Sequence, residues 1–235
     1  MHGQDTVAAS AAGQETADRR WPARVDALQS LSGLALTLFL AVHLLLDAAI
    51  LVGPPAADWV AHLFEGEPFF GRRYSAIVSV AALGLLLLVA LHAALALRRL
   101  PCSVAQYQTL RAHAARLHHA DTRLWWWQVV TGFVLFFLVG AHLAVMITQP
   151  EAIGAQPSAE RVVAARAGIF YLLFLPVVLV HAAVGLYRLA IKWGWPAGIG
   201  RAALKRSVGL VALAYLLLGL AALAAYAALG MKLAG

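Results

Sequence analysis

Five long runs of almost uninterrupted apolar residues alternate with shorter polar segments along the chain. The runs are Leu31–Val52, Ser75–Leu97, Trp126–Thr148, Ile169–Ile191 and Val208–Leu229. Each run is long enough to cross about 30 Å of hydrocarbon as an α-helix. The pattern therefore predicts an all-α integral membrane protein with five transmembrane helices.

The composition supports this fold class. Hydrophobic residues make up 62% of the 235 residues and charged residues only 12%, whereas a soluble domain has roughly 25% charged residues. Such a chain cannot cover a water-soluble surface, which excludes a soluble enzyme, a disordered chain and a disulfide scaffold. The single Cys102 excludes an internal disulfide and a CxxC metal site.

The segments between the apolar runs are too short to form a second domain. They are Gly53–Tyr74, Arg98–Trp125, Gln149–Gly168 and Lys192–Ser207. Any soluble catalysis must then belong to partner subunits. Residues 1–24 are predicted to be a cytoplasmic tail, flexible over about the first 20 residues and without the apolar core of a signal peptide. Residues 25–235 are predicted to be the membrane domain.

Lysine and arginine are distributed unevenly between the two ends of the predicted spans. The tail, the second connection and the fourth connection, with Arg188 at its edge, carry 13 of the 18 basic residues. By the positive-inside rule these segments are cytoplasmic, which places the N-terminus inside and the C-terminus outside. The net charge of +7 is then a topology signal and a rim for anionic lipid or a protein partner, and no nucleic acid is expected.

Two helical hairpins appear duplicated, and each carries two histidines. Gln29-x-x-Ser32-Gly33 precedes His43 by the spacing with which Gln128-x-x-Thr131-Gly132 precedes His142. The stretch from His92 to Arg99 likewise matches the stretch from His181 to Arg188. The repeat predicts that His43 faces His142 and that His92 faces His181. The fifth span has no histidine and is expected to be a packing helix.

The two predicted pairs lie at different depths, about 10 Å apart along the membrane normal from their positions in the spans. Stacked imidazole pairs inside a helical bundle are typical of two haems, each with two axial histidines. Small residues would let the flat macrocycle approach the backbone; they are Gly33, Gly132, Gly140, Gly185 and the Ala pairs after His92 and His181. Small residues in membrane helices also serve as plain helix contacts.

Two other classes of function compete with a di-haem protein. A transition-metal transporter could use the four histidines as ligands, but it would want them at one depth together with carboxylate or thiolate ligands. A haem-delivery or purely structural membrane protein is the third possibility. The remaining histidines are expected to be mostly solvated; they are His2, His62, His113, His118 and His119.

Several stretches of unusual composition resemble one family. They are Asp26-Ala-Leu-Gln-Ser, Asp121-Thr-Arg-Leu-Trp-Trp-Trp-Gln, Thr131-Gly-Phe, Thr148-Gln-Pro and His181 through Trp195. From about Trp21 to Leu229 the chain resembles the single-subunit, five-helix, di-haem cytochrome b of the succinate:quinone oxidoreductases, the branch that includes bacterial menaquinol:fumarate reductases.

The resemblance implies a subunit of the bacterial inner membrane that anchors a flavoprotein and an iron–sulfur protein on the cytoplasmic face. It implies an inner haem b on His92 and His181 and an outer haem b on His43 and His142. Electrons would pass between menaquinol or menaquinone and the iron–sulfur chain. A dimer of heterotrimers is also implied.

Further site residues follow from the same resemblance. The inner haem propionates would meet Gln29, Ser30, Trp125 and Lys192, which also stand at the cytoplasmic ends of three spans. The outer-haem counterparts would be Arg161 and Tyr171. Lys192 would also suit a snorkelling anchor, and the tryptophans an interfacial belt.

Glu65, in the first outer loop, matches the acidic residue that takes the proton from menaquinol. Oxidation of a quinol releases two protons with its two electrons, so a carboxylate base at the site is chemically useful. The alternative interpretation is that Glu65 and Glu67 are ordinary loop charges.

One position departs from the family pattern. Some members carry a glutamate two residues before the fourth histidine, for proton transfer that offsets electron transfer. The residue here is Leu179, which predicts electrogenic turnover. Asp47, one turn after His43, is an extra acid that would contact water, a haem propionate or the quinone region, and it lies too near the outer face to replace a mid-membrane relay.

Overall fold

The computed structural model describes residues 2–101, 103–117, 120–195 and 198–235, and all regular elements among them are helical. The long helices are α1 (His2–Asp47), α4 (Ala76–Leu97), α6 (Ala120–Thr148), α8 (Ala167–Trp193) and α9 (Gly200–Ala234). The shorter helices are η1 (Ala48–Leu51), α2 (Pro54–Phe64), α3 (Glu67–Phe70), α5 (Val104–Leu117) and α7 (Ala155–Val163).

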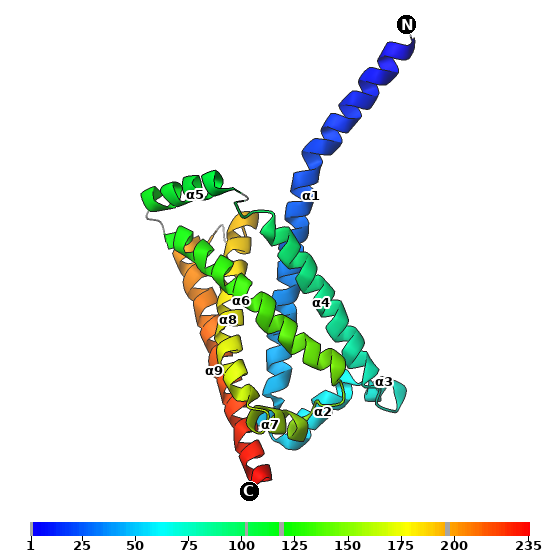
Figure 1. The fold of residues 1–235 in the computed structure, drawn as a ribbon, viewed down its shortest axis with the longest axis vertical. Coiled ribbons are helices and arrows are strands. Elements are labelled where there is room, and N and C mark those ends of the chain that lie inside the picture. Colours follow the sequence, from blue (N-terminus) through cyan, green and yellow to red (C-terminus); the bar gives the residue numbers. More distant parts are fainter. Residues whose placement is uncertain (1, 102, 118–119, 196–197) are drawn as a thin grey trace.

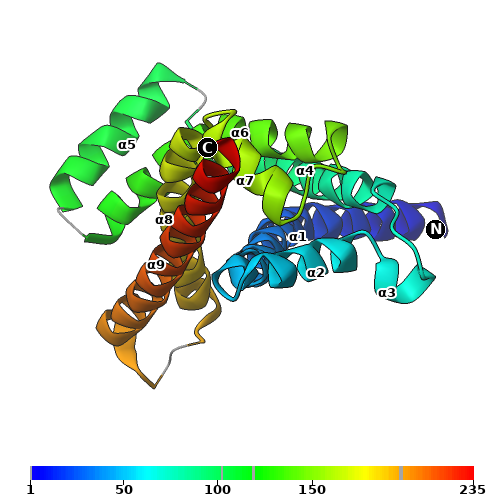
Figure 2. The same ribbon diagram turned by 90° about the horizontal axis from the view of Figure 1, so that it is seen from below.

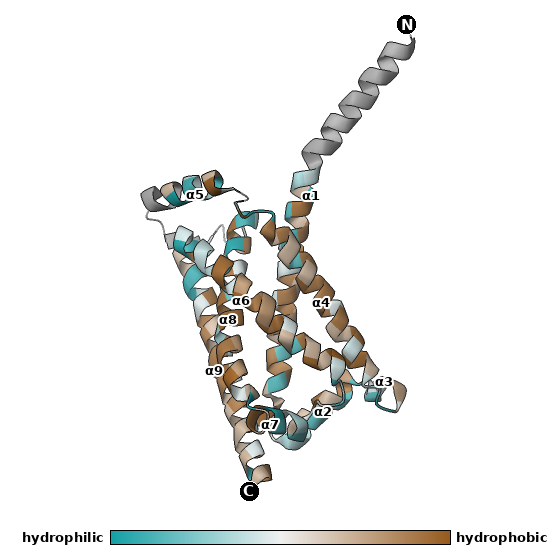
Figure 3. Cartoon of the chain, viewed as in Figure 1, coloured by the Kyte–Doolittle hydropathy of each residue, from teal (hydrophilic) through white to brown (hydrophobic). Residues whose placement is uncertain are grey.

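Among the described residues, five helices are long and apolar enough to cross a membrane, which confirms the predicted fold class. Their candidate spans are Trp21–Leu51, Ala76–Leu97, Thr122–Thr148, Ala167–Trp193 and Gly200–Ala234. Figure 3 shows apolar residues along the middle of these helices and more hydrophilic residues toward their ends. Backbone groups in hydrocarbon must bond within their own segment, which a helix achieves.

α8 and α9 extend beyond their apolar runs at both ends. α1 begins before its run and continues back to His2; the expectation that the first 20 residues are flexible stays a prediction. This segment is rich in alanine, the residue with the highest helix propensity, and it extends an existing helix without a new nucleation step. Its predicted cytoplasmic location stays a prediction.

The short helices divide between the two ends of the bundle. α5 lies at one end, and α2, α3 and α7 lie at the other (Figure 1); we call these the α5 end and the α7 end. α9 lies against α8, on the side of the molecule away from α4 (Figures 1 and 2). Polar segments at both ends therefore frame an apolar bundle.

The α7 end holds the most tightly packed part of the molecule. Its buried cluster is made of small and aromatic side chains from η1, α2, α7 and α9: Ile50, Ala57, Ala155, Ala159, Val162, Ala222 and Tyr226. A Cβ on Gly230 would lie 2.5 Å from the carbonyl oxygen of Ala159. Glycine and alanine thus let α7 and α9 approach closely, as is typical of helix contacts in membranes.

Candidate functional site

The structure pairs the histidines nearer the α7 end as the repeat predicts. The ring centroids of His43 on α1 and His142 on α6 are 6.3 Å apart. Two imidazole nitrogens that each bind one metal atom at about 2 Å would hold their rings at a similar separation. Phe39 stacks on His43 with centroids 5.4 Å apart, and Tyr171 and Phe174 of α8 pack against His142.

The other two histidines are each held by a hydroxyl from the neighbouring repeat helix. Ser32 Oγ on α1 lies 3.0 Å from His92 Nδ1 on α4. Thr131 Oγ1 on α6 lies 3.1 Å from His181 Nδ1 on α8. His92 and His181 are also close enough to interact electrostatically. The two histidines of the second predicted pair therefore make the same kind of contact, a hydroxyl of the repeat against Nδ1.

These contacts fix which ring nitrogen carries the proton. His181 Nδ1 lies 3.1 Å from the backbone oxygen of Gln128, which can only accept a hydrogen bond. The Ser32 hydroxyl donates to the backbone oxygen of Gln29 at 3.0 Å, so it accepts from His92. Both Nδ1 atoms are then donors, and each Nε2 keeps the lone pair that a metal needs.

Two glycines of the repeat contact imidazoles. A Cβ on Gly33 would lie 2.9 Å from His92 Cε1, and one on Gly132 would lie 3.0 Å from His181 Cε1. In the structure these glycines make room for the imidazole rings, and the expectation that they leave room for a macrocycle stays a prediction. A Cβ on Gly140 would meet nothing within 4 Å, so its surroundings remain open.

The two pairs are separated along the bundle. His43 follows Gly33, the contact of His92, by ten residues, and His142 follows Gly132, the contact of His181, by ten residues. At 1.5 Å per residue this is about 15 Å along the helices, more than the roughly 10 Å expected. In the part of the chain that the structure describes, no three metal-ligating side chains gather around one point, which disfavours a four-histidine transporter site.

Two buried polar atoms without a hydrogen-bond partner fit the binding of a further group at these places. His142 Nδ1 and Gln29 Oε1 are buried without a hydrogen-bond partner among the described residues. Buried polar atoms are nearly always satisfied. Because the O and N atoms of an amide are hard to tell apart, Gln29 can present a donor to an acidic group. The donor set, two imidazoles at each place, fits a bis-histidine haem iron.

Two of the four expected inner propionate partners meet at the α5 end. Lys192 Nζ, at the end of α8, lies 2.9 Å from Ser30 Oγ on α1. The same nitrogen lies 2.9 Å from Asp26 Oδ2. The ring of Trp125 packs edge-on against Trp126, with ring centroids 5.0 Å apart, and its contact with a propionate stays a prediction.

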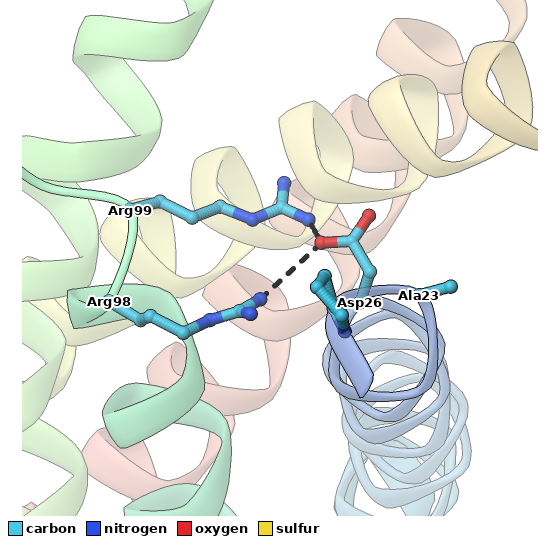
Figure 4. A pocket seen from close by; sticks show the side chains of 5 residues that line it. Ala23, Asp26, Arg98 and Arg99 are labelled. Atoms are coloured by element: carbon cyan, nitrogen blue, oxygen red, sulfur yellow. Dashed lines mark hydrogen bonds and ion pairs between the residues drawn. The ribbon is translucent and has the colours of Figure 1, made fainter. Parts of the chain in front are cut away.

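The sequence analysis gave Asp26 no role, but it is the centre of the α5-end group. Arg98 and Arg99 also pair with it, at a shallow pocket of about 450 Å³ that Figure 4 shows. The sequence could have indicated this role, because Asp26 is an acid near the start of a span and many basic residues are predicted at the same membrane face. Exposed pairs of this kind contribute only about 0.2–1 kcal/mol each, so the carboxylate mainly sets where the cations lie.

A second polar group lies at the α7 end and includes both expected outer-haem counterparts. Arg161 of α7 hydrogen-bonds the hydroxyl of Tyr171 and donates to the backbone oxygen of Ala152. The Tyr226 hydroxyl of α9 donates to Asp47. Tyr226 was missed because the fifth span was interpreted as a packing helix without polar function.

The side chain of Glu65 is nearly buried, with 9% of its surface exposed, and lies 3.8 Å from Arg73. It follows α2 as the C-cap residue, and the α2–α3 corner is at the α7 end (Figure 1). Burial distinguishes Glu65 from an ordinary loop charge. Glu67 is more exposed and pairs with His62 at 2.9 Å.

Five other residues that the sequence analysis named lie wholly or in part outside what the structure describes. Cys102, His118 and His119 lie outside the described residues. The side chains of His2 and His113 are likewise outside what the structure describes.

Comparison with known proteins decides the family. The profile described as "Succinate dehydrogenase/Fumarate reductase transmembrane subunit" matches residues 104–222, about half of the chain. A fumarate reductase cytochrome b subunit from Helicobacter pylori is 40% identical over 210 residues, which cover 89% of this chain and 82% of that protein. The chain belongs to the succinate dehydrogenase/fumarate reductase transmembrane subunit family.

A second relative comes from another genus. The fumarate reductase cytochrome b subunit of Wolinella succinogenes is 39% identical over 217 residues, covering 91% of this chain and 85% of that protein. Both similarities extend beyond the profile match and include most of the first hairpin. This chain is thus a membrane subunit of the fumarate reductase and succinate dehydrogenase type.

Proposed function

We propose that this chain is the membrane anchor and electron-transfer subunit of a succinate:quinone oxidoreductase, with two b haems. His92 and His181 would hold one haem, and His43 and His142 the other. The observation that carries the proposal is the pair of imidazoles His92 and His181, whose Nδ1 atoms both donate to protein groups. A bound haem supplies an iron that accepts and releases one electron at a time.

The protein groups around each pair serve the proposed cofactors in distinct ways. Ser32 and Thr131 fix the tautomer and orientation of the inner imidazoles. Lys192 and Ser30 offer donors to propionates at the α5 end, and Gln29 offers a buried amide. Arg161 and Tyr171 offer hydrogen-bond donors to propionates at the α7 end. Trp125 stays a predicted contributor.

Glu65 is the proposed base for menaquinol. Its carboxylate would accept a proton from the quinol hydroxyl as the quinol is oxidised. Its burial, and the position of the α2–α3 corner at the α7 end, support this role. Menaquinone would be the product in this direction and the substrate in the reverse direction.

The partners and orientation follow from the family and the charge distribution. We propose that a flavoprotein and an iron–sulfur subunit dock at the α5 end, on the cytoplasmic face of the bacterial inner membrane. Most basic residues lie in the segments of this end, in agreement with the positive-inside rule. A dimer of heterotrimers is the assembly that we propose, surrounded by the lipid bilayer.

A reduced-minus-oxidised visible spectrum of the purified protein tests the proposed class. We expect the bands of a b-type cytochrome, and co-purification with two soluble subunits. A colourless protein that binds transition metals would instead support a transporter. A haem protein that purifies without soluble partners would support haem delivery or a structural role.

Glu65→Gln tests the quinone site. We expect this variant to lose quinol-linked turnover by at least 100-fold, since general acid–base groups contribute roughly 10²- to 10⁴-fold. The haems and the dye-linked activity of the soluble subunits should be unchanged, because the amide is nearly isosteric with the carboxylate. Normal menaquinol oxidation by the variant would mean that the base lies elsewhere.

A further inference from the structure

A chain of polar contacts leads from the buried Glu65 to the surface. Arg73 Nη1 lies 3.8 Å from Glu65 Oε2 and 3.3 Å from His62 Nε2. His62 Nδ1 lies 2.9 Å from Glu67 Oε2. The Glu65 side chain is 9% exposed, whereas the side chains of Arg73 and His62 are 57% and 39% exposed. The buried carboxylate is therefore connected to two neighbours that both reach the surface.

The backbone of the α2–α3 corner creates this arrangement. His62 is in the last turn of α2, and Gly66 reverses the chain with a φ of 78°. A Cβ on Gly66 would lie 2.8 Å from both Ile77 and Phe70, so the corner is tightly packed. The N–H of Tyr74 then donates to the backbone oxygen of Glu65 at 2.9 Å, which brings the preceding Arg73 back beside Glu65.

The contacts determine the protonation pattern of His62. The Glu67 carboxylate can only accept, so His62 Nδ1 carries the proton. Arg73 can only donate, so His62 Nε2 is the unprotonated nitrogen and its lone pair accepts from Arg73. A carboxylate that orients an imidazole in this way makes its far nitrogen a proton acceptor. Arg73 itself does not give up a proton in proteins and serves to hold the two neighbours.

We propose that His62, oriented by Glu67, receives the protons that leave Glu65 and releases them to the water at the α7 end. This rests on the proposed function of Glu65 as the quinol base. Each quinol O–H bond that breaks gives its proton to the Glu65 carboxylate, while the electrons leave through the subunit. The Glu65 O–H bond then breaks, the hydrogen bond from Arg73 to His62 Nε2 opens, and through a bridging water an N–H bond forms at that nitrogen.

The relay is completed when His62 transfers that proton to surface water and returns to its neutral form. Imidazole suits this step because its ring nitrogens can both accept and donate a proton. The charged groups that face His62 are Glu67, Arg73 and, through Arg73, Glu65. Arg72 of the same loop is engaged by Tyr74. Without a relay, the rate of turnover would be limited by direct proton transfer from Glu65 to water, and only 9% of the Glu65 side chain is exposed.

His62→Gln in the complete membrane-bound complex tests the proposal. Glutamine can keep a donor to Glu67 and an acceptor for Arg73, but it cannot carry a proton. We expect quinol-linked kcat to fall about 10-fold with KM unchanged, and free imidazole in the buffer to restore most of the rate. Haem content and dye-linked activity should match the unaltered complex.

Glu67→Gln is the second variant, because it loosens the orientation of His62 and keeps its proton chemistry. We expect a smaller loss of rate that imidazole also restores. Glu151→Gln, which removes an exposed acid after α6, is the matched control and should have no effect. A normal rate for His62→Gln, or a loss that imidazole does not restore, would overturn the relay. An active Glu65→Gln would instead overturn the proposed quinol base.

Discussion

At the residue scale, the hydroxyls next to the inner histidines carry much of the site's specificity. Ser32 and Thr131 occupy equivalent positions of the repeat and contact Nδ1 of His92 and His181. Each hydroxyl also donates to its own helix backbone, so its oxygen is left to accept from the imidazole. The repeat therefore duplicates the hydrogen bonds that orient the two imidazoles as well as the histidines themselves.

Ser32→Ala should weaken the inner haem site selectively. Loss of a hydrogen bond behind a metal-ligating histidine typically lowers affinity 10- to 100-fold. The backbone oxygen of Gln29 remains near His92, so we expect a loss of about 10-fold. The haem affinity is measured as the amount of haem that the variant retains during titration with a competing apo-protein, compared with the unaltered protein.

Thr37→Val is the matched control, because Thr37 is a hydroxyl on the same helix that bonds only the backbone oxygen of Gly33. Equal haem loss in both variants would show that Ser32 acts through helix stability and not through His92.

At the element scale, α9 positions polar residues of the α7 end in addition to packing against the bundle. It packs against α7 through Gly230 and places Tyr226 on Asp47. α7 in turn begins at a backbone N–H of Ala155 that donates to Asp58 of α2 at 2.8 Å. Arg161 is thus positioned by contacts from both α2 and α9.

Gly230→Ala should destabilise the α7 end. The new Cβ would meet a backbone oxygen at 2.5 Å, which cannot move aside as a flexible side chain can. Overpacking of this kind typically costs about 1–3 kcal/mol. Thermal unfolding in detergent should show a lower midpoint than for the unaltered protein.

Gly209→Ala is the control on the same helix, since a Cβ there would contact nothing within 4 Å. A midpoint for Gly230→Ala that equals this control would contradict the close α7–α9 contact.

The sequence predicted the spans and the pairing of the histidines because both depend on periodic patterns. Apolar runs locate helices, and the repeat locates equivalent ligands. It did not predict the role of Asp26 or Tyr226, since these contacts join α1 to α4, α8 or α9. Nor did it predict that Gly33 would contact His92, because which face of a helix meets which neighbour is set by three-dimensional packing.

At the scale of the whole molecule, the question is whether proton transfer through the bundle balances the proposed electron transfer across the membrane. Leu179 is 7% exposed, so its position faces the interior of the bundle. Helix α8 contains no acidic residue from Ala167 to Trp193. A carboxylate that could carry protons at this depth alongside the electrons is therefore missing from this helix.

We predict electrogenic turnover for this reason. Each elementary charge that crosses the membrane is worth about 2.3 kcal/mol per 100 mV. Such turnover suits succinate oxidation by menaquinone, which the membrane potential could drive. Sealed proteoliposomes with a potential-sensitive dye should develop a potential during menaquinol–fumarate turnover. An absent potential, together with succinate–menaquinone turnover that ignores an uncoupler, would contradict the interpretation of Leu179.

The central claim is that two separate imidazole pairs each hold one haem, and haem stoichiometry tests it most directly. A pyridine haemochrome assay of the purified complex should give two b haems per chain. His92→Ala or His181→Ala should leave one haem, and His43→Ala or His142→Ala should leave the other, with a different spectrum. One haem or none in the unaltered protein would contradict the account.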